Sequence, residues 1–208
     1  TAIVSLSNSF GTLSAGRDKH AVTRALDNFD VLENTYGTIV GSIHSAQGSR
    51  VQNAVFLTTA PMAGFTGTYQ MANSETAGTT NVQAGSINYS LGALSATVAK
   101  YDDSVSSTST TAGVKYTIAS TGTTVFGLYS DDTVSGVSTS GKSVGVRQDI
   151  SPQLALLANY GETNTGVTGR GVGVAYAMNK ALTFHARYSY IDTTTDVTQY
   201  GVGVEFNF

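Results

Sequence analysis

Residues 197–208, which read VTQYGVGVEFNF, decide the fold class of this chain. Even-numbered positions carry Thr, Tyr, Val, Val, Phe and Phe, whereas the odd-numbered positions from 199 onward carry Gln, Gly, Gly, Glu and Asn. Alternation with a period of two predicts a β-strand whose two faces meet different surroundings. An aromatic outer face of this kind is expected where lipid lies outside a barrel and water fills its interior.

The composition of the whole chain agrees with a membrane barrel. Of 208 residues, 40% are hydrophobic and only 12% are charged, and no apolar run approaches the ~18 residues of a transmembrane helix. The formal net charge of −3 argues against a nucleic-acid partner. Cysteine is absent and no tight His/Asp/Glu spacing occurs, so we expect neither a metal nor a cofactor. A β-sandwich or a fibrous adhesin could share this composition.

The same alternation recurs along the chain and predicts about thirteen strands. Residues 182–191 give the clearest case, with Phe184 and Tyr188 on one face and His185 and Arg187 on the other. Short connections alternate with longer polar ones, as in barrels with short periplasmic turns and long outer loops. We expect the longer connections at 18–50, 72–80, 102–110, 131–140, 163–168 and 192–196.

We therefore predict an all-β fold, a transmembrane antiparallel β-barrel in which residues 1–208 form a single domain. Bacterial single-chain barrels have an even number of strands, and thirteen is odd. We expect an odd number of N-terminal strands to be missing from this sequence. Three missing strands would give the intact protein 16.

The predicted connection at 18–50 is the longest of the chain. Long loops in a compact domain are usually functional or disordered. This one carries acidic residues together with enough apolar residues to pack: Val22, Leu26, Phe29, Val31, Leu32, Tyr36, Ile39, Val40 and Ile43. Two interpretations stay open at this point. The segment either folds into the barrel and packs on the inner wall, or it is an exposed loop or short helical turn.

Three short motifs around this segment resemble the general trimeric porins of Gram-negative bacteria. They are Gly16-Arg17, Asp30-Val31-Leu32 and Arg50-Val51. The family's following acidic residue stands one place early here, at Glu33, with Asn34 at the usual position. The resemblance implies an integral outer-membrane protein, a homotrimer and a passive diffusion channel for small hydrophilic solutes and ions. It also implies that 18–50 is a constriction loop folded into the lumen.

A basic wall facing an acidic loop would create a transverse field across a narrow, wet passage. The candidate constriction residues are Arg17, Arg24, Asp27, Asp30, Glu33 and Arg50, and the candidate pore-lining residues are Lys115, Arg147 and Arg187. The simpler alternative is that these charges form local ion pairs, for instance Arg147 with Asp149, and only keep the bore wet.

The predicted outer-membrane barrel has further expected partners, and other functions stay open. Membrane lipid and lipopolysaccharide are expected around the barrel, and Gly203, Phe206 and Phe208 are similar to the signal that the outer-membrane assembly machinery reads. We expect no enzymatic activity. One alternative is a substrate-selective channel, which would need a row of aromatic side chains along the bore. Another is a surface adhesin or structural barrel. A third is a hydrolase, which would need a Ser or Asp beside His185.

Overall fold

The computed structural model describes residues 1–33, 37–44, 50–73 and 81–206, and most of the described chain folds into one antiparallel sheet. Thirteen strands pair in sequence order, each with its chain neighbours, which confirms the predicted fold class and strand number. Asn34, Tyr36, Glu75 and Phe208 lie outside the described residues. The strands are β1 (Ala2–Asn8), β2 (Gly11–Lys19), β3 (Arg50–Thr59), β4 (Phe65–Ala72), β5 (Val82–Leu91), β6 (Leu94–Asp102), β7 (Ser107–Ile118), β8 (Thr123–Val134), β9 (Val137–Asp149), β10 (Leu154–Thr163), β11 (Thr168–Ala177), β12 (Leu182–Asp192) and β13 (Val197–Phe206).

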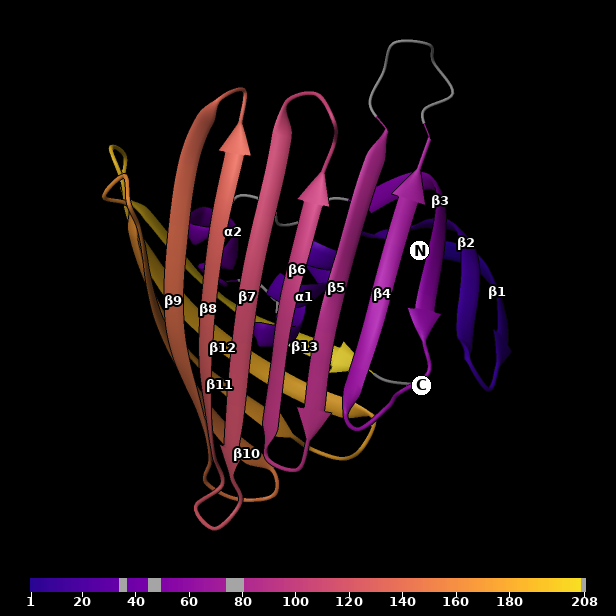
Figure 1. The fold of residues 1–208 in the computed structure, drawn as a ribbon. Helices are drawn as coiled ribbons and strands as arrows, with labels where there is room; N and C mark the ends of the chain where they lie inside the picture. Colours follow the sequence, from indigo (N-terminus) through magenta and orange to yellow (C-terminus); the bar gives the residue numbers. More distant parts are fainter. Residues whose placement is uncertain (34–36, 45–49, 74–80, 207–208) are drawn as a thin grey trace.

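The sheet is strongly curved, and its two faces differ as the alternation predicted (Figure 1). On β12, Phe184 and Tyr188 are exposed on the convex face, whereas His185, Arg187 and Ser189 are buried on the concave face. The pleat sends successive side chains to opposite faces, so one strand can meet lipid and an aqueous interior at once.

The connections are shorter than predicted at several places, and the expected long connection at 131–140 is wrong. There β8 and β9 continue to a turn at Ser135 and Gly136, whose φ angles are +50° and +82°. Positive φ at both central residues is typical of the tight turn that suits strand twist. Polar residues in this stretch face each other across paired strands instead of forming a loop.

In the described part of the connection between β2 and β3, two helices lie within the concave side of the sheet (Figure 1). They are α1 (Ala21–Phe29) and α2 (Val40–Ile43). No helix within the described ranges is long and apolar enough to cross a membrane. The described part of the segment 18–50 is therefore partly helical and lies on the concave side of the sheet.

Helix α1 forms because its apolar residues recur at helical spacing and its first turn is capped. Val22, Leu26 and Phe29 fall on one face of the helix and are buried. His20 is the N-cap, and its Nδ1 accepts a hydrogen bond of 3.2 Å from the backbone N–H of Thr23. The apolar face packs on Ala84, Ala99 and Leu128, which lie on the inner faces of β5, β6 and β8. Burial of each large apolar side chain contributes roughly 1.5–3 kcal/mol.

Candidate functional site

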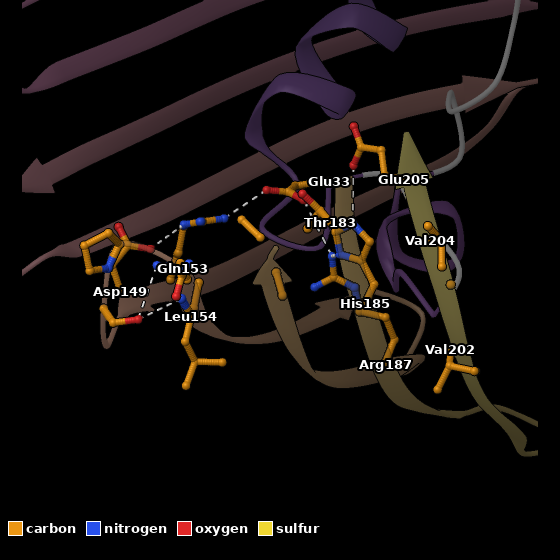
Figure 2. Close-up of a pocket in the computed structure, with 18 residues that line it drawn as sticks. Glu33, Asp149, Gln153, Leu154, Thr183, His185, Arg187, Val202, Val204 and Glu205 are labelled. Carbon is orange, nitrogen blue, oxygen red and sulfur yellow. Dashed lines mark hydrogen bonds and ion pairs between the residues drawn. The ribbon is translucent and has the colours of Figure 1, made fainter. Parts of the chain in front are cut away.

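A cavity of about 690 Å³ opens on the concave side of the sheet, between β9–β13 and the described part of residues 18–50, which we call the helical segment. Figure 2 shows its side chains, with Glu33 reaching in from the helical segment toward His185 and Arg187 on β12. Glu205 enters from β13, the neighbouring strand. Charged groups from three separated parts of the chain thus meet in one water-accessible space.

Glu33 is the centre of the charge network in this cavity. Its Oε1 is 3.0 Å from Nη1 of Arg147 on β9, and its Oε2 is 3.6 Å from Nη2 of Arg187 on β12. Arg147 also pairs with Asp149 through its Nε at 2.9 Å. The pairing of Arg147 with Asp149, expected as the simpler alternative, therefore coexists with a pairing to the helical segment.

Arg187 carries the most buried charge in the cavity, with 5% of its surface exposed. Its Nη2 donates a hydrogen bond of 2.9 Å to Nδ1 of His185. Within the described ranges its Nε and Nη1 have no hydrogen-bond partner, and the guanidinium packs over Gly173. A buried charge is costly unless an opposite charge compensates it, so Glu33 stabilises Arg187 and Arg187 in turn fixes where Glu33 lies.

The other candidate constriction residues lie elsewhere on the helical segment and its flanks. Arg24 pairs with Asp18, and Asp27 pairs with Lys19. Asp30 is buried, where it accepts hydrogen bonds from the backbone N–H of Leu32 (3.0 Å) and from the hydroxyl of Thr38 (2.6 Å). Arg24 and Asp27 attach the segment to the end of β2, and Asp30 forms hydrogen bonds within the segment. Glu33 extends from the segment into the cavity.

The remaining predicted basic residues are spread over the sheet. Arg17 is exposed near the end of β2, and Arg50 is exposed at the start of β3. Lys115 of β7 places its Nζ 5.6 Å from the ring centroid of Phe29, a cation–π contact with the end of α1. Of the nine predicted residues, the structure brings Glu33, Arg147 and Arg187 together. Asp30 lies close enough to interact electrostatically with Arg187, and the other five lie elsewhere on the sheet and the helical segment.

Glu205 was not among the predicted site residues. Its carboxylate lies 3.3 Å from Nε2 of His185. Strand alternation was the available signal, because Glu205 shares the odd-numbered face of β13 with Gly201 and Gly203, which also line the cavity.

The carboxylates of Glu33 and Glu205 and the imidazole of His185 offer ligand atoms within 4.8 Å of one another, a spacing that a metal ion could bridge. The hydrogen bonds around them oppose that use. Arginine is always a donor, so Nδ1 of His185 accepts from Arg187 and its Nε2 carries the proton that faces Glu205. A cation would have to displace that proton and compete with two guanidinium groups for Glu33.

His44 superficially resembles the base of a hydrolytic dyad. Its Nδ1 is 2.8 Å from the hydroxyl of Ser130, and its Nε2 is 3.0 Å from that of Ser143. The side chain is fully buried, and burial lowers the pKa of the imidazole to about 4, although the nearby carboxylate of Asp132 partly opposes this shift. A solute cannot reach His44, so its role is to connect the helical segment to β8 and β9.

Comparison with known proteins identifies the family. The family model described as Gram-negative porin matches residues 1–208. The anion-selective porin from Comamonas acidovorans superposes with a TM-score of 0.83 at 18% identity, over 99% of this chain and 77% of that one. OmpF of Salmonella typhi, in a complex with daunomycin, superposes with a TM-score of 0.75 at 14% identity, over 98% and 77% of the two chains. A search of curated proteins found no match.

This chain therefore belongs to the Gram-negative porin family. It is an integral protein of the bacterial outer membrane and forms a passive diffusion channel for small hydrophilic solutes and ions. The family and its fold are those of channels.

Proposed function

We propose that the segment 18–50 is the constriction loop of this channel and that Glu33 pairs with Arg147 and Arg187 at its narrowest charged part. The observation that carries this proposal is the ion pairing of Glu33 with both arginines, which come from β9 and β12. A loop carboxylate held against two wall guanidinium groups narrows the bore and polarises it at the same place.

The expected mechanism is electrostatic and needs no covalent step. Water and polar solutes that pass beside the cluster of Glu33, Arg147 and Arg187 can align their dipoles with the field that these charges create in the adjacent bore, and low-dielectric walls focus that field. An apolar solute would have to displace water from charged groups without replacing its hydrogen bonds. The channel then admits solutes by polarity and size, and we infer that it catalyses no reaction.

The proposed assembly is a homotrimer in the outer membrane. One of the similar structures, OmpT of Vibrio cholerae, is described in a trimer form, and it superposes on this chain with a TM-score of 0.72 at 15% identity. Exposed apolar side chains on the convex face suit both lipid, including lipopolysaccharide acyl chains, and neighbouring subunits. The proposed signal for the assembly machinery comprises Gly203, Phe206 and Phe208.

Single-channel recording in a planar bilayer under a salt gradient tests the proposed constriction. Glu33→Gln removes one negative charge from the bore, so we expect the reversal potential to shift toward anion preference. The control is Glu162→Gln, because Glu162 pairs with Lys142 and Tyr160 at a distance from the cavity. A reversal potential that is the same in Glu33→Gln and in the unmodified channel would contradict the proposed role of Glu33.

A further inference from the structure

Glycines cluster on the inner wall beneath the helical segment. On β9–β11 they stand close together, since Gly161 pairs directly with Gly169, and Gly145 and Gly171 pair with the same residue, Asn159. The sheet therefore presents backbone without side chains at several neighbouring positions, with Asn159 between Gly145 and Gly171, and Gly113 lies apart on β7. We call the wall glycines that contact the segment the glycine floor: Gly113, Gly141, Gly145, Gly161, Gly169 and Gly171.

Apolar side chains from the first half of the segment fill the space that wall side chains would otherwise occupy. A β-carbon added to Gly113 would lie 2.7 Å from Cγ of Phe29, and one added to Gly145 would lie 2.8 Å from Cγ1 of Val31. Two carbons in favourable contact are about 3.5–4.0 Å apart. There is no room at these positions for even one methyl group.

The second half of the segment contacts the same floor. A β-carbon on Gly169 would lie 3.1 Å from Cβ of Ile39, and one on Gly161 would lie 3.1 Å from Cγ1 of Ile43. At Gly141 the added carbon would lie 2.0 Å from the carbonyl oxygen of Ile43, so the backbone of the segment itself approaches the wall. Ile39 and Ile43 are almost completely buried.

Strand glycines normally weaken a sheet, and they are expected where another backbone or a ligand approaches closely. We propose that the glycine floor sets the distance of the segment from the barrel wall, and thereby the width of the bore and the position of Glu33. Val31, which contacts Gly145, stands only two residues before Glu33. This inference rests on the proposed function, because it assumes that the segment is the constriction.

Small additions to the floor should displace the segment into the bore. Tightly packed contacts transmit such a change instead of absorbing it. We expect Gly145→Ala to lower single-channel conductance and to shift the reversal potential, because Glu33 moves relative to Arg147. The control is Gly67→Ala on the convex face of β4, away from the segment, where the added carbon has its nearest contact at an ordinary 3.7 Å, with the Thr59 side chain.

A compensating change separates positioning from general damage to the barrel. Val31→Ala removes the methyl group closest to Gly145, so the double variant Gly145→Ala with Val31→Ala should regain most of the lost conductance. Val31→Phe adds bulk from the segment side and leaves every wall residue unchanged. It should lower conductance as Gly145→Ala does, and it decides the question if Gly145→Ala does not fold.

The outcomes distinguish this inference from the proposed constriction. Conductance that stays unchanged in folded Gly145→Ala or in Val31→Phe would overturn the role of the glycine floor. If Glu33→Gln shifts the reversal potential while the floor variants behave like Gly67→Ala, the floor alone is rejected. If Glu33→Gln and the floor variants are all silent, the segment is not the constriction and both proposals fail.

Discussion

Glu33 combines an unusual backbone conformation with two ion pairs. It has a φ angle of +60°, which non-glycine residues seldom adopt. Such a conformation persists only when surrounding contacts over-determine it, and here two arginines hold the carboxylate. The strained backbone and the charge network therefore occur at the same position.

His44 gives a prediction at the scale of a residue. The ordinary histidine pKa is 6.5, and burial lowers that of His44 to about 4. Because the folded state resists protonation, the contribution of His44 to stability is full at neutral pH and is lost as the pH falls from about 6.5 to 4. The loss is about 2 kcal/mol at pH 5. We expect amide hydrogen exchange in α2 to accelerate between pH 7.5 and 5, after correction for the intrinsic rate.

His44→Gln is the matched variant, because glutamine keeps a donor and an acceptor for Ser130 and Ser143 but does not titrate in this range. It should remove most of the acid sensitivity of α2. His20, whose pKa burial also lowers to about 4, accounts for the remainder near α1. An equal acid response in His44→Gln and the unmodified protein would refute this explanation.

At the scale of elements, α1 is attached to the wall by its apolar face. Leu26 is completely buried in the cluster that α1 forms with β5, β6 and β8. Leu26→Ala leaves a cavity there and should destabilise the docking of α1 by about 2–5 kcal/mol. The strands keep their own hydrogen bonds, so we expect faster proteolysis and hydrogen exchange of α1 without loss of the barrel.

Asn28→Ala is the control for this variant, since Asn28 is exposed on the opposite side of α1. Substitutions at exposed positions usually change stability by about 0.5 kcal/mol or less. If Leu26→Ala lowered the unfolding midpoint of the whole sheet and left the protection of α1 unchanged, α1 would not be an independently docked element.

At the scale of the whole molecule, the two faces of the sheet predict opposite responses to charge. Val98 lies midway along β6 and is exposed on the convex face. Val98→Lys should destabilise the protein in lipid vesicles by about 2–4 kcal/mol if Val98 lies near the bilayer midplane. Ser86→Lys on the concave face of β5 should cost much less, because its ammonium group can stay in water.

Urea titration of both variants in vesicles measures this difference. Equal destabilisation by Val98→Lys and Ser86→Lys would mean that the convex face does not contact lipid. Both variants are measured in the assembled protein. A position that a neighbouring subunit covers would then respond as a buried position and not as a lipid-facing one.

The sequence predicted the strands well because their signal is local. In β12 the alternation alone placed His185 and Arg187 on the face opposite Phe184 and Tyr188. It failed at 131–140, where polar residues suggested a loop. Polar side chains are tolerated on both faces near the ends of strands that extend beyond the lipid, so polarity could not distinguish an extended hairpin from a loop there.

Alternation by itself therefore determined the sheet, its strand number and which side chains face inward. The tertiary structure alone decided which inward charges meet. Arg147 and Glu33 are 114 residues apart in sequence, and their contact depends on how the sheet curves and how closely the segment approaches the wall. That approach depends on glycines such as Gly145, which carry no side-chain signal of their own. Alternation with a period of two specifies which face of the sheet each side chain occupies. The distance between Glu33 and Arg147 depends instead on how the segment packs against the curved wall.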